Sequence, residues 1–327
     1  MENSQYVKET LGSEGRMRWG NFVFSHPVLQ PLSIPFIDIT AAVPGPKLAI
    51  VAGMHPNEVA AMEAALRLKD YFASSLEKGS VSILPVLNMP GLWIHSEYVF
   101  PADNRNMNFL SPGNPDGSYT EILLDWVLQH FAAGADLFID LHGGDLREDV
   151  AKFVMCQMTG DAAFDDLTKA YAHQYDADVL MDFAVEQTNN RGRATNELPF
   201  LGRHAVMSEA GANGILDEES TAFHFNGVAN IARFLGMTFD PPAPKKRANR
   251  TAHNSWKIET PVDGRIYLDV KAGDIVAAGQ RMARMKDLFG NPLPDIVAPF
   301  RGAVIVVMTH NITVKGEWLF SLAPVEE

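Results

Sequence analysis

Two histidines and two glutamates in this 327-residue chain have the types and spacing for metal-assisted hydrolysis. His55 and Glu58 lie close together, whereas His142 and Glu209 follow much later in the chain. Two imidazoles and one carboxylate are a standard ligand set for a catalytic zinc, with the fourth position open to water or substrate. We therefore predict that His55, Glu58 and His142 hold one Zn²⁺ per chain. Glu209 is the candidate general base, which takes a proton from the attacking water and passes it to the leaving amine.

Each of these residues also has a structural interpretation. His55 could cap a helix, Glu58 could complement the helix dipole, His142 could be a buried histidine with satisfied hydrogen bonds, and Glu209 could be a carboxylate at a helix start. The catalytic interpretation is favoured because these residues follow or end apolar runs at 47–53, 135–141 and 204–208. Open α/β sheets gather functional residues at the carboxyl ends of their strands.

The pattern of apolar runs and helix formers predicts the elements that position these residues. After a lead-in of about forty residues, irregular or β-rich, strands are expected at 47–53, 80–87, 135–141, 153–158 and 204–208. Helices are expected at 60–76, 120–131, 161–175 and 218–235. The turn-rich stretch 100–117 is too long for a simple connector, and loops of that size are often functional. Strands alternating with helices predict an α/β fold, a mostly parallel mixed sheet with helices on both faces.

The last quarter of the chain has a different texture. Prolines followed by basic residues mark 241–256 as a linker, which separates an α/β domain at 1–240 from a β-rich domain at 257–327. A weak repeat relates 260–266 to 298–304 and 273–279 to 310–316, and it resembles the biotinyl/lipoyl carrier fold, a small barrel or sandwich. Lys286 lies roughly where that fold carries its modified lysine, but the methionine that should follow is absent. We expect an ordinary surface lysine.

Composition narrows the classes of partner and compartment. The formal net charge is −13, which argues against nucleic acid or an anionic membrane as partner. The N-terminus shows no signal-peptide pattern and no apolar run is long enough to span a bilayer, so we expect a cytoplasmic protein. The single cysteine, Cys156, excludes an intrachain disulfide and a Cys-rich zinc site, and its apolar setting is typical of an inert core thiol.

The motifs together resemble a known family. The pair His55 and Glu58, the strand-end His142 and the run 208–211 around Glu209 are similar to the succinylglutamate desuccinylase/aspartoacylase family, a branch of the zinc carboxypeptidase superfamily. The resemblance covers roughly 40–235, and the β-rich tail fits the family's second domain. It implies a zinc-carboxypeptidase-like fold with these residues as zinc ligands and general base. It also implies a zinc-dependent amidohydrolase, or deacylase, whose substrate is a small N-acyl amino acid or N-acyl diamino acid.

The chain departs from the family pattern where the substrate is bound. Asn106 and Asn108 match a family motif, but Phe109 stands where the family has an arginine that helps to hold the substrate carboxylate. The upstream arginine that polarises the scissile carbonyl has no clear equivalent, and Tyr98 lies nearest its place. The substrate-binding candidates are therefore Asn106 and Asn108 with Arg105, Arg191 or Arg193 as replacement, because bidentate pairing with arginine gives carboxylate recognition its specificity.

Two other functions fit the same residues. The first is a zinc carboxypeptidase that acts on small peptides. The second is a catalytically inactive, metal-dependent binding protein, which the missing arginines make plausible. The expected partner in each case is a small molecule, with neither nucleic acid nor membrane, and a homo-oligomer is compatible with the sequence. We expect the tail domain to shape or shield the rim of the pocket.

Overall fold

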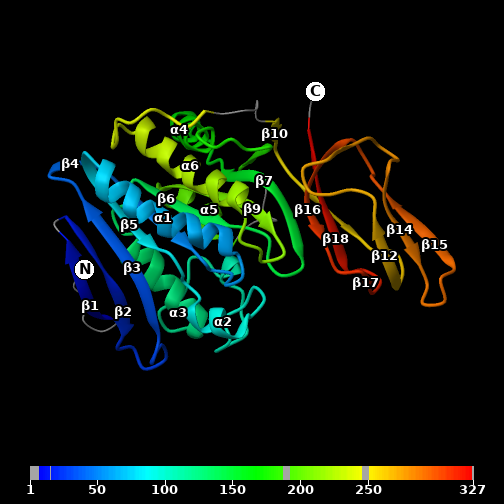
Figure 1. The fold of residues 1–327 in the computed structure, drawn as a ribbon, viewed down its shortest axis with the longest axis horizontal. Helices are drawn as coiled ribbons and strands as arrows, with labels where there is room; N and C mark the ends of the chain where they lie inside the picture. The colour runs from blue at the N-terminus through cyan, green and yellow to red at the C-terminus, as the bar shows by residue number, and fades with distance from the viewer. Residues whose placement is uncertain (1–6, 15, 187–191, 245–249, 326–327) are drawn as a thin grey trace.

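Four parallel strands form the centre of the molecule (Figure 1). The fold is taken from a computed structural model that describes residues 7–14, 16–186, 192–244 and 250–325. The central strands lie in the order β5 (Lys78–Leu84), β4 (Val43–Ala52), β6 (Leu137–His142) and β9 (His204–Ala212), all paired in parallel. Three of the predicted active-site segments thus leave one sheet at the same edge, because the carboxyl ends of parallel strands coincide.

Further strands extend this centre on both sides. The first described part of the chain forms β1 (Val7–Glu14), β2 (Met17–Phe24) and β3 (Ser33–Thr40). Each pairs antiparallel with the next, and β3 pairs antiparallel with β5. On the other side β7 (Glu148–Gln157) runs antiparallel to β9. Beyond it, β8 (Val179–Phe183) pairs in parallel with β7, and β10 (Arg250–Ala252) pairs in parallel with β8. The expected mixed sheet is confirmed, and β10 places a strand inside the stretch predicted as linker.

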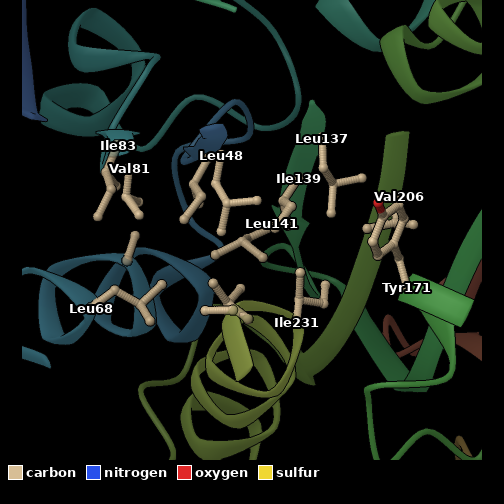
Figure 2. Packing of buried hydrophobic residues seen from close by; sticks show 14 of the residues in the cluster. Leu48, Leu68, Val81, Ile83, Leu137, Ile139, Leu141, Tyr171, Val206 and Ile231 are labelled. Atoms are coloured by element: carbon tan, nitrogen blue, oxygen red, sulfur yellow. The ribbon is translucent and has the colours of Figure 1, made fainter. Parts of the chain in front are cut away.

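Helices cover both faces of the sheet, and the alternating side chains of β4 define these faces. Leu48 and Ile50 belong to one apolar cluster, Ala49 and Val51 to another. Successive strand residues point to opposite faces, so the two clusters are the two sides of the sheet. One side is covered by α1 (Val59–Ser75), α4 (Ala162–Ala172) and α6 (Glu218–Phe234), and the other by α3 (Tyr119–Trp126) and the π-helical turn η2 (Val127–Phe131). Figure 2 shows Leu48 and Leu141 facing Leu68 of α1 and Ile231 of α6.

Short helical segments lie in the connections between β5 and α3 and between β8 and β9. They are α2 (Met89–Ile94), η1 (Met107–Phe109), α5 (Ala194–Glu197) and η3 (Leu198–Leu201). Two predicted helices end early, because the expected helix at 120–131 turns π-helical at Val127 and the one at 161–175 ends at Ala172. None of the helices in the described part of the chain is long and apolar enough to cross a membrane.

The C-terminal region is all-β, as expected, and it forms a two-sheet sandwich. One sheet contains β15 (Pro292–Val297), β14 (Arg281–Lys286), β12 (Gly264–Leu268) and β17 (Ile312–Thr313). The other contains β11 (Trp256–Glu259), β13 (Ile275–Val276), β16 (Gly302–Met308) and β18 (Trp318–Pro324). This second sheet is continuous with the central one, because β16 pairs antiparallel with β7. One apolar cluster joins both sheets of the sandwich to β7 and β8.

Two residues noted in the sequence have ordinary surroundings. Cys156 is buried in β7, and burial raises the pKa of its thiol to about 12, as expected of a core thiol. Lys286 lies at the end of β14 with its Nζ 5.7 Å from the centroid of the Tyr267 ring.

Candidate active site

His55, Glu58 and His142 converge at the carboxyl edge of the central strands. His55 Nδ1 lies 2.7 Å from Glu58 Oε1, and His142 Nδ1 lies 2.9 Å from Glu58 Oε2. One potential ligand atom from each residue lies within 4.8 Å of the others, and all three residues are buried. Gly53 makes the turn possible: its φ is +63°, and a Cβ there would meet the Met62 side chain at 2.9 Å.

The chemistry of this group fits a divalent metal ion. Two imidazole nitrogens and a carboxylate oxygen are ligands that suit zinc. Glu58 Oε2 and His142 Nδ1 are buried without a hydrogen-bond partner, although they lie 2.9 Å apart. Buried polar atoms rarely stay unpaired, and a cation bound between these atoms would satisfy them. That these residues hold a metal stays a prediction.

The buried charges around this group shift one another's pKa values. Burial alone would raise the pKa of Glu58, but the imidazoles of His55 and His142 lower it to about 2. Burial alone would lower the pKa of His142, but the carboxylates of Asp140 and Glu58 hold it well above the ordinary value. Asp140 Oδ1 lies 3.2 Å from His142 Nε2, on the side of the ring away from Glu58, and both residues are fully buried. A carboxylate in that place orients a ligand histidine and increases its basicity.

Glu209 reaches the same edge from the neighbouring strand. It lies opposite His142 in the parallel pairing of β9 with β6, and it lines the pocket described below. Burial raises the pKa of Glu209 well above its ordinary value; His142 opposes that shift, whereas the charges of Glu58 and Glu148 add to it. The structural alternative for Glu209 does not hold, because the residue is in a strand and the next helix, α6, begins at Glu218.

A pocket of about 700 Å³ opens in front of these residues. Its polar part contains His55, Glu58 and Glu209, and its apolar part includes Phe153 and Met155 of β7. The C-terminal sandwich closes one side with residues of β11, β16 and β18 and of the turn before β11: Asn254, Ser255, Trp256, Lys257, Ile305, Val306, Trp318 and Ser321. Lys257 Nζ lies 4.4 Å from the centroid of the Trp318 ring, so this wall also carries a positive charge.

Asn106 and Asn108 both line the pocket. Asn106 Oδ1 accepts a hydrogen bond from the backbone N–H of Asn108 at 2.9 Å and lies 3.2 Å from His55 Nε2. Asn108 is 5% exposed, and its Oδ1 has no hydrogen-bond partner. A free buried acceptor facing a pocket is available to an N–H donor of a ligand.

The structure describes two of the three candidate arginines and places one of these two at the pocket. Arg193 lines the pocket, with its guanidinium 5.1 Å from the centroid of the Phe109 ring. Burial lowers the pKa of Arg193, and the charges of Glu209 and Asp140 oppose that shift. Arg105 is not brought to the pocket: it forms an ion pair with Glu121 at 2.8 Å, at the start of α3. Arg191 lies outside the described residues.

Two pocket residues, Tyr98 and Glu148, were not among the predicted site residues. The ring of Tyr98 lies edge-on to that of His55, with centroids 5.5 Å apart. Its backbone is left-handed (φ 60°), and its N–H donates to Asp145 Oδ2 at 3.1 Å, while Asp145 Oδ1 accepts from Asn57 Nδ2 at 2.7 Å. The only sequence signal for Tyr98 was its place near a missing family arginine.

Glu148 begins β7, in a stretch whose polar residues did not indicate a strand. It is 7% exposed and lines the pocket, and its Oε2 accepts the backbone N–H of Asp145 at 3.2 Å. Burial, followed by the charge of Glu58, raises the pKa of Glu148 to about 7. Glu148 could have been found only if the strand predicted at 153–158 had been extended toward the N-terminus.

Comparisons with known proteins agree on one family. Residues 44–235 match the profile of the succinylglutamate desuccinylase/aspartoacylase catalytic domain. N-alpha-acetyl-L-2,4-diaminobutyric acid deacetylase from Halomonas elongata is 27% identical over 259 residues, 75% of this chain and 71% of that protein. The product-bound ectoine utilization protein EutE from Ruegeria pomeroyi has the same fold, with a TM-score of 0.86 and 21% identity over 98% of this chain and 99% of that one. A succinylglutamate desuccinylase from a Silicibacter species also has a TM-score of 0.86, with 19% identity over 98% of both chains.

Proposed function

This chain belongs to the succinylglutamate desuccinylase/aspartoacylase family, and from that membership we propose that it is a zinc-dependent deacylase. Its substrate is a small N-acyl amino acid or N-acyl diamino acid, whose amide bond it hydrolyses to a carboxylic acid and an amine. The relative from Halomonas elongata, named for the deacetylation of an N-acetyl diamino acid, supports this choice of substrate class.

One observation carries the proposal: a buried His–Glu–His group lies beside a small pocket that His55, Glu58 and the strand carboxylate Glu209 line. His55, Glu58 and His142 would hold the ion. Zinc, when bound, supplies a Lewis acid that makes water a better nucleophile near neutral pH and polarises the acyl carbonyl.

The protein itself moves the proton. The Glu209 carboxylate accepts a proton from the attacking water and delivers it to the nitrogen of the leaving amine. Its position across from His142 places it beside the ligand group, and the rigid sheet fixes both residues.

Substrate orientation falls to Arg193 and the two asparagines. Arg193 takes the role of the family arginine whose place in the sequence Phe109 occupies, and it pairs with the substrate carboxylate. Its guanidinium lies against the Phe109 ring, and both residues line the pocket. Asn106 and Asn108 hold the amide. Arg193 is half-buried where it lines the pocket, and this strengthens such pairing because water competes less there.

The pocket favours this function over the two alternatives. Its volume of about 700 Å³ and the wall built by residues 254–257 and β16 and β18 suit a small molecule better than an extending peptide. An inactive binding protein would have no use for Glu209 beside the ligand group. We also retain the division into an α/β domain at 1–240, a linker at 241–256 and a β-rich domain at 257–327, with the last acting as the pocket wall.

The test is deacylation of a library of N-acetyl, N-succinyl and N-formyl amino acids and diamino acids by the purified protein, with and without a chelator. Turnover of at least one member that stops with the chelator supports the proposal. A preference for dipeptides over all N-acyl amino acids would favour the carboxypeptidase. Bound metal without turnover across the library would favour the binding protein.

A further inference from the structure

Glu148 is a pocket carboxylate that the reaction does not use. Three carboxylates line the pocket among the described residues: Glu58, Glu148 and Glu209. Glu58 contacts both histidines, and Glu209 is the proposed base. Glu148 does neither, yet it is almost fully buried at the beginning of β7.

No basic side chain in the described ranges forms an ion pair with Glu148. Arg147, its neighbour in sequence, pairs with Glu97 at 2.7 Å. Arg193 and Lys257, the arginine and lysine that line the pocket among the described residues, lie against the rings of Phe109 and Trp318. The hydrogen bond from the backbone of Asp145 fixes the Glu148 carboxylate in place but does not neutralise it.

A buried carboxylate without a cation is unfavourable, and such groups are normally paired. The nearby charge of Glu58 makes the position still more negative, with His55 opposing it in part, and the phenol of Tyr98 is the neutral group beside the carboxylate. A cationic ligand group would therefore gain a desolvated, charge-assisted hydrogen bond at this point of the pocket.

We propose that Glu148 receives the free side-chain ammonium of the substrate, and so selects N-acyl diamino acids over N-acyl amino acids with neutral side chains. This inference rests on the proposed deacylase function. The zwitterionic substrate then has two charged contacts, its carboxylate at Arg193 and its ammonium at Glu148, and the acyl amide lies between them at the His–Glu–His group. Asn108 Oδ1, buried and unpaired, accepts the amide N–H.

The experiment compares two substrates that differ in one group. N-α-acetyl-2,4-diaminobutyric acid carries the side-chain ammonium, and N-acetylnorvaline has a methyl group in its place. We measure kcat and KM of the zinc-loaded wild type, Glu148→Gln, Glu148→Asp and Glu218→Gln. Glu218→Gln is the control, because it removes a carboxylate whose side chain is 71% exposed and does not line the pocket.

We expect the wild type and Glu218→Gln to prefer the ammonium substrate in kcat/KM by roughly ten- to a hundred-fold, the range of a charged hydrogen bond. In Glu148→Gln the preference falls toward one, chiefly through KM, and Glu148→Asp keeps part of it. A structural role for Glu148 predicts equal losses on both substrates, and an unchanged ratio in Glu148→Gln overturns the inference.

The wild type alone keeps the inference testable if Glu148→Gln fails to fold. Hydrolysis of both compounds without preference for the ammonium overturns the role of Glu148 and leaves the deacylase function standing. Hydrolysis of neither compound, nor of any other N-acyl amino acid, refutes the deacylase function itself.

Discussion

Glu209 lies opposite His142 in the parallel pairing of β9 with β6. The relationship places the proposed base and a proposed metal ligand side by side on adjacent strands, where both backbones are fixed by the sheet. A shift of one residue in this register would turn one of the side chains to the other face. The catalytic arrangement therefore depends on the correct pairing of two central strands that are about sixty residues apart in sequence.

The first prediction concerns Glu209. Glu209→Gln keeps the shape of the side chain but cannot accept a proton, so kcat should fall by roughly 10²–10⁴-fold, the usual contribution of a general base. Zinc content and thermal stability should stay close to those of the wild type, because Glu209 is not one of the three ligands. Wild-type turnover in this variant would show that another group moves the proton.

The second prediction distinguishes the roles of Arg193 and Arg105, the two candidate substrate-binding arginines that the structure describes. Arg193→Ala should raise KM by roughly ten- to a hundred-fold, because a charged hydrogen bond to the substrate carboxylate is lost. Arg105→Ala is the matched control, since Arg105 pairs with Glu121 outside the pocket, and its KM should change by less than about two-fold. Steady-state kinetics give the KM of both variants. A larger rise of KM in Arg105→Ala than in Arg193→Ala would mean that Arg105 binds the substrate carboxylate.

Much of the sheet was accessible to sequence analysis because its strands are short apolar runs closed by glycine or polar residues. The runs before Met54, His142 and Glu209 became β4, β6 and β9 for that reason. The family resemblance and the mixed α/β sheet with an all-β C-terminal region are confirmed. What local patterns could not show was pairing between distant segments, such as β16 with β7, which makes the C-terminal sheet continuous with the central one.

The site was harder to predict where side chains have competing partners. Arg105 is close to the asparagine motif in sequence, but Glu121 captures it because Glu121 also forms the capping box with Ser118 at the start of α3. Glu148 escaped notice because β7 opens with the polar residues Glu148 and Asp149, although both pair with β16. Polar residues at a strand start look like loop until the partner strand is known.

A third prediction concerns stability and pH in metal-free protein. The pKa of Glu148 is about 7 in the folded chain against 4.5 for an ordinary glutamate, so the folded state binds more protons between these values. The free energy of unfolding should therefore fall as pH rises from about 4.5 to 7. Glu148→Gln should remove up to about 3 kcal/mol of that fall. Urea unfolding at several pH values measures it, and an unchanged pH slope in the variant contradicts the assignment.

A fourth prediction concerns the wall built by the C-terminal sandwich. Trp318→Ala removes a ring that lines the pocket and contacts Lys257, so the pocket should widen. We expect the ratio of kcat/KM for N-benzoyl over N-acetyl substrates to rise several-fold. Phe289→Ala is the control, because this ring is 93% exposed and does not line the pocket. An identical acyl preference in all three proteins would mean that the wall has no part in substrate choice.

The most direct test of the whole account is a zinc titration of chelator-treated protein, with deacylation and bound metal measured in the same samples. We predict that activity is absent without metal, rises with added zinc and levels off at one ion per chain, and that His142→Ala neither binds the ion nor gains activity. Full deacylase activity in protein free of metal, or full zinc binding and activity in His142→Ala, would contradict the account.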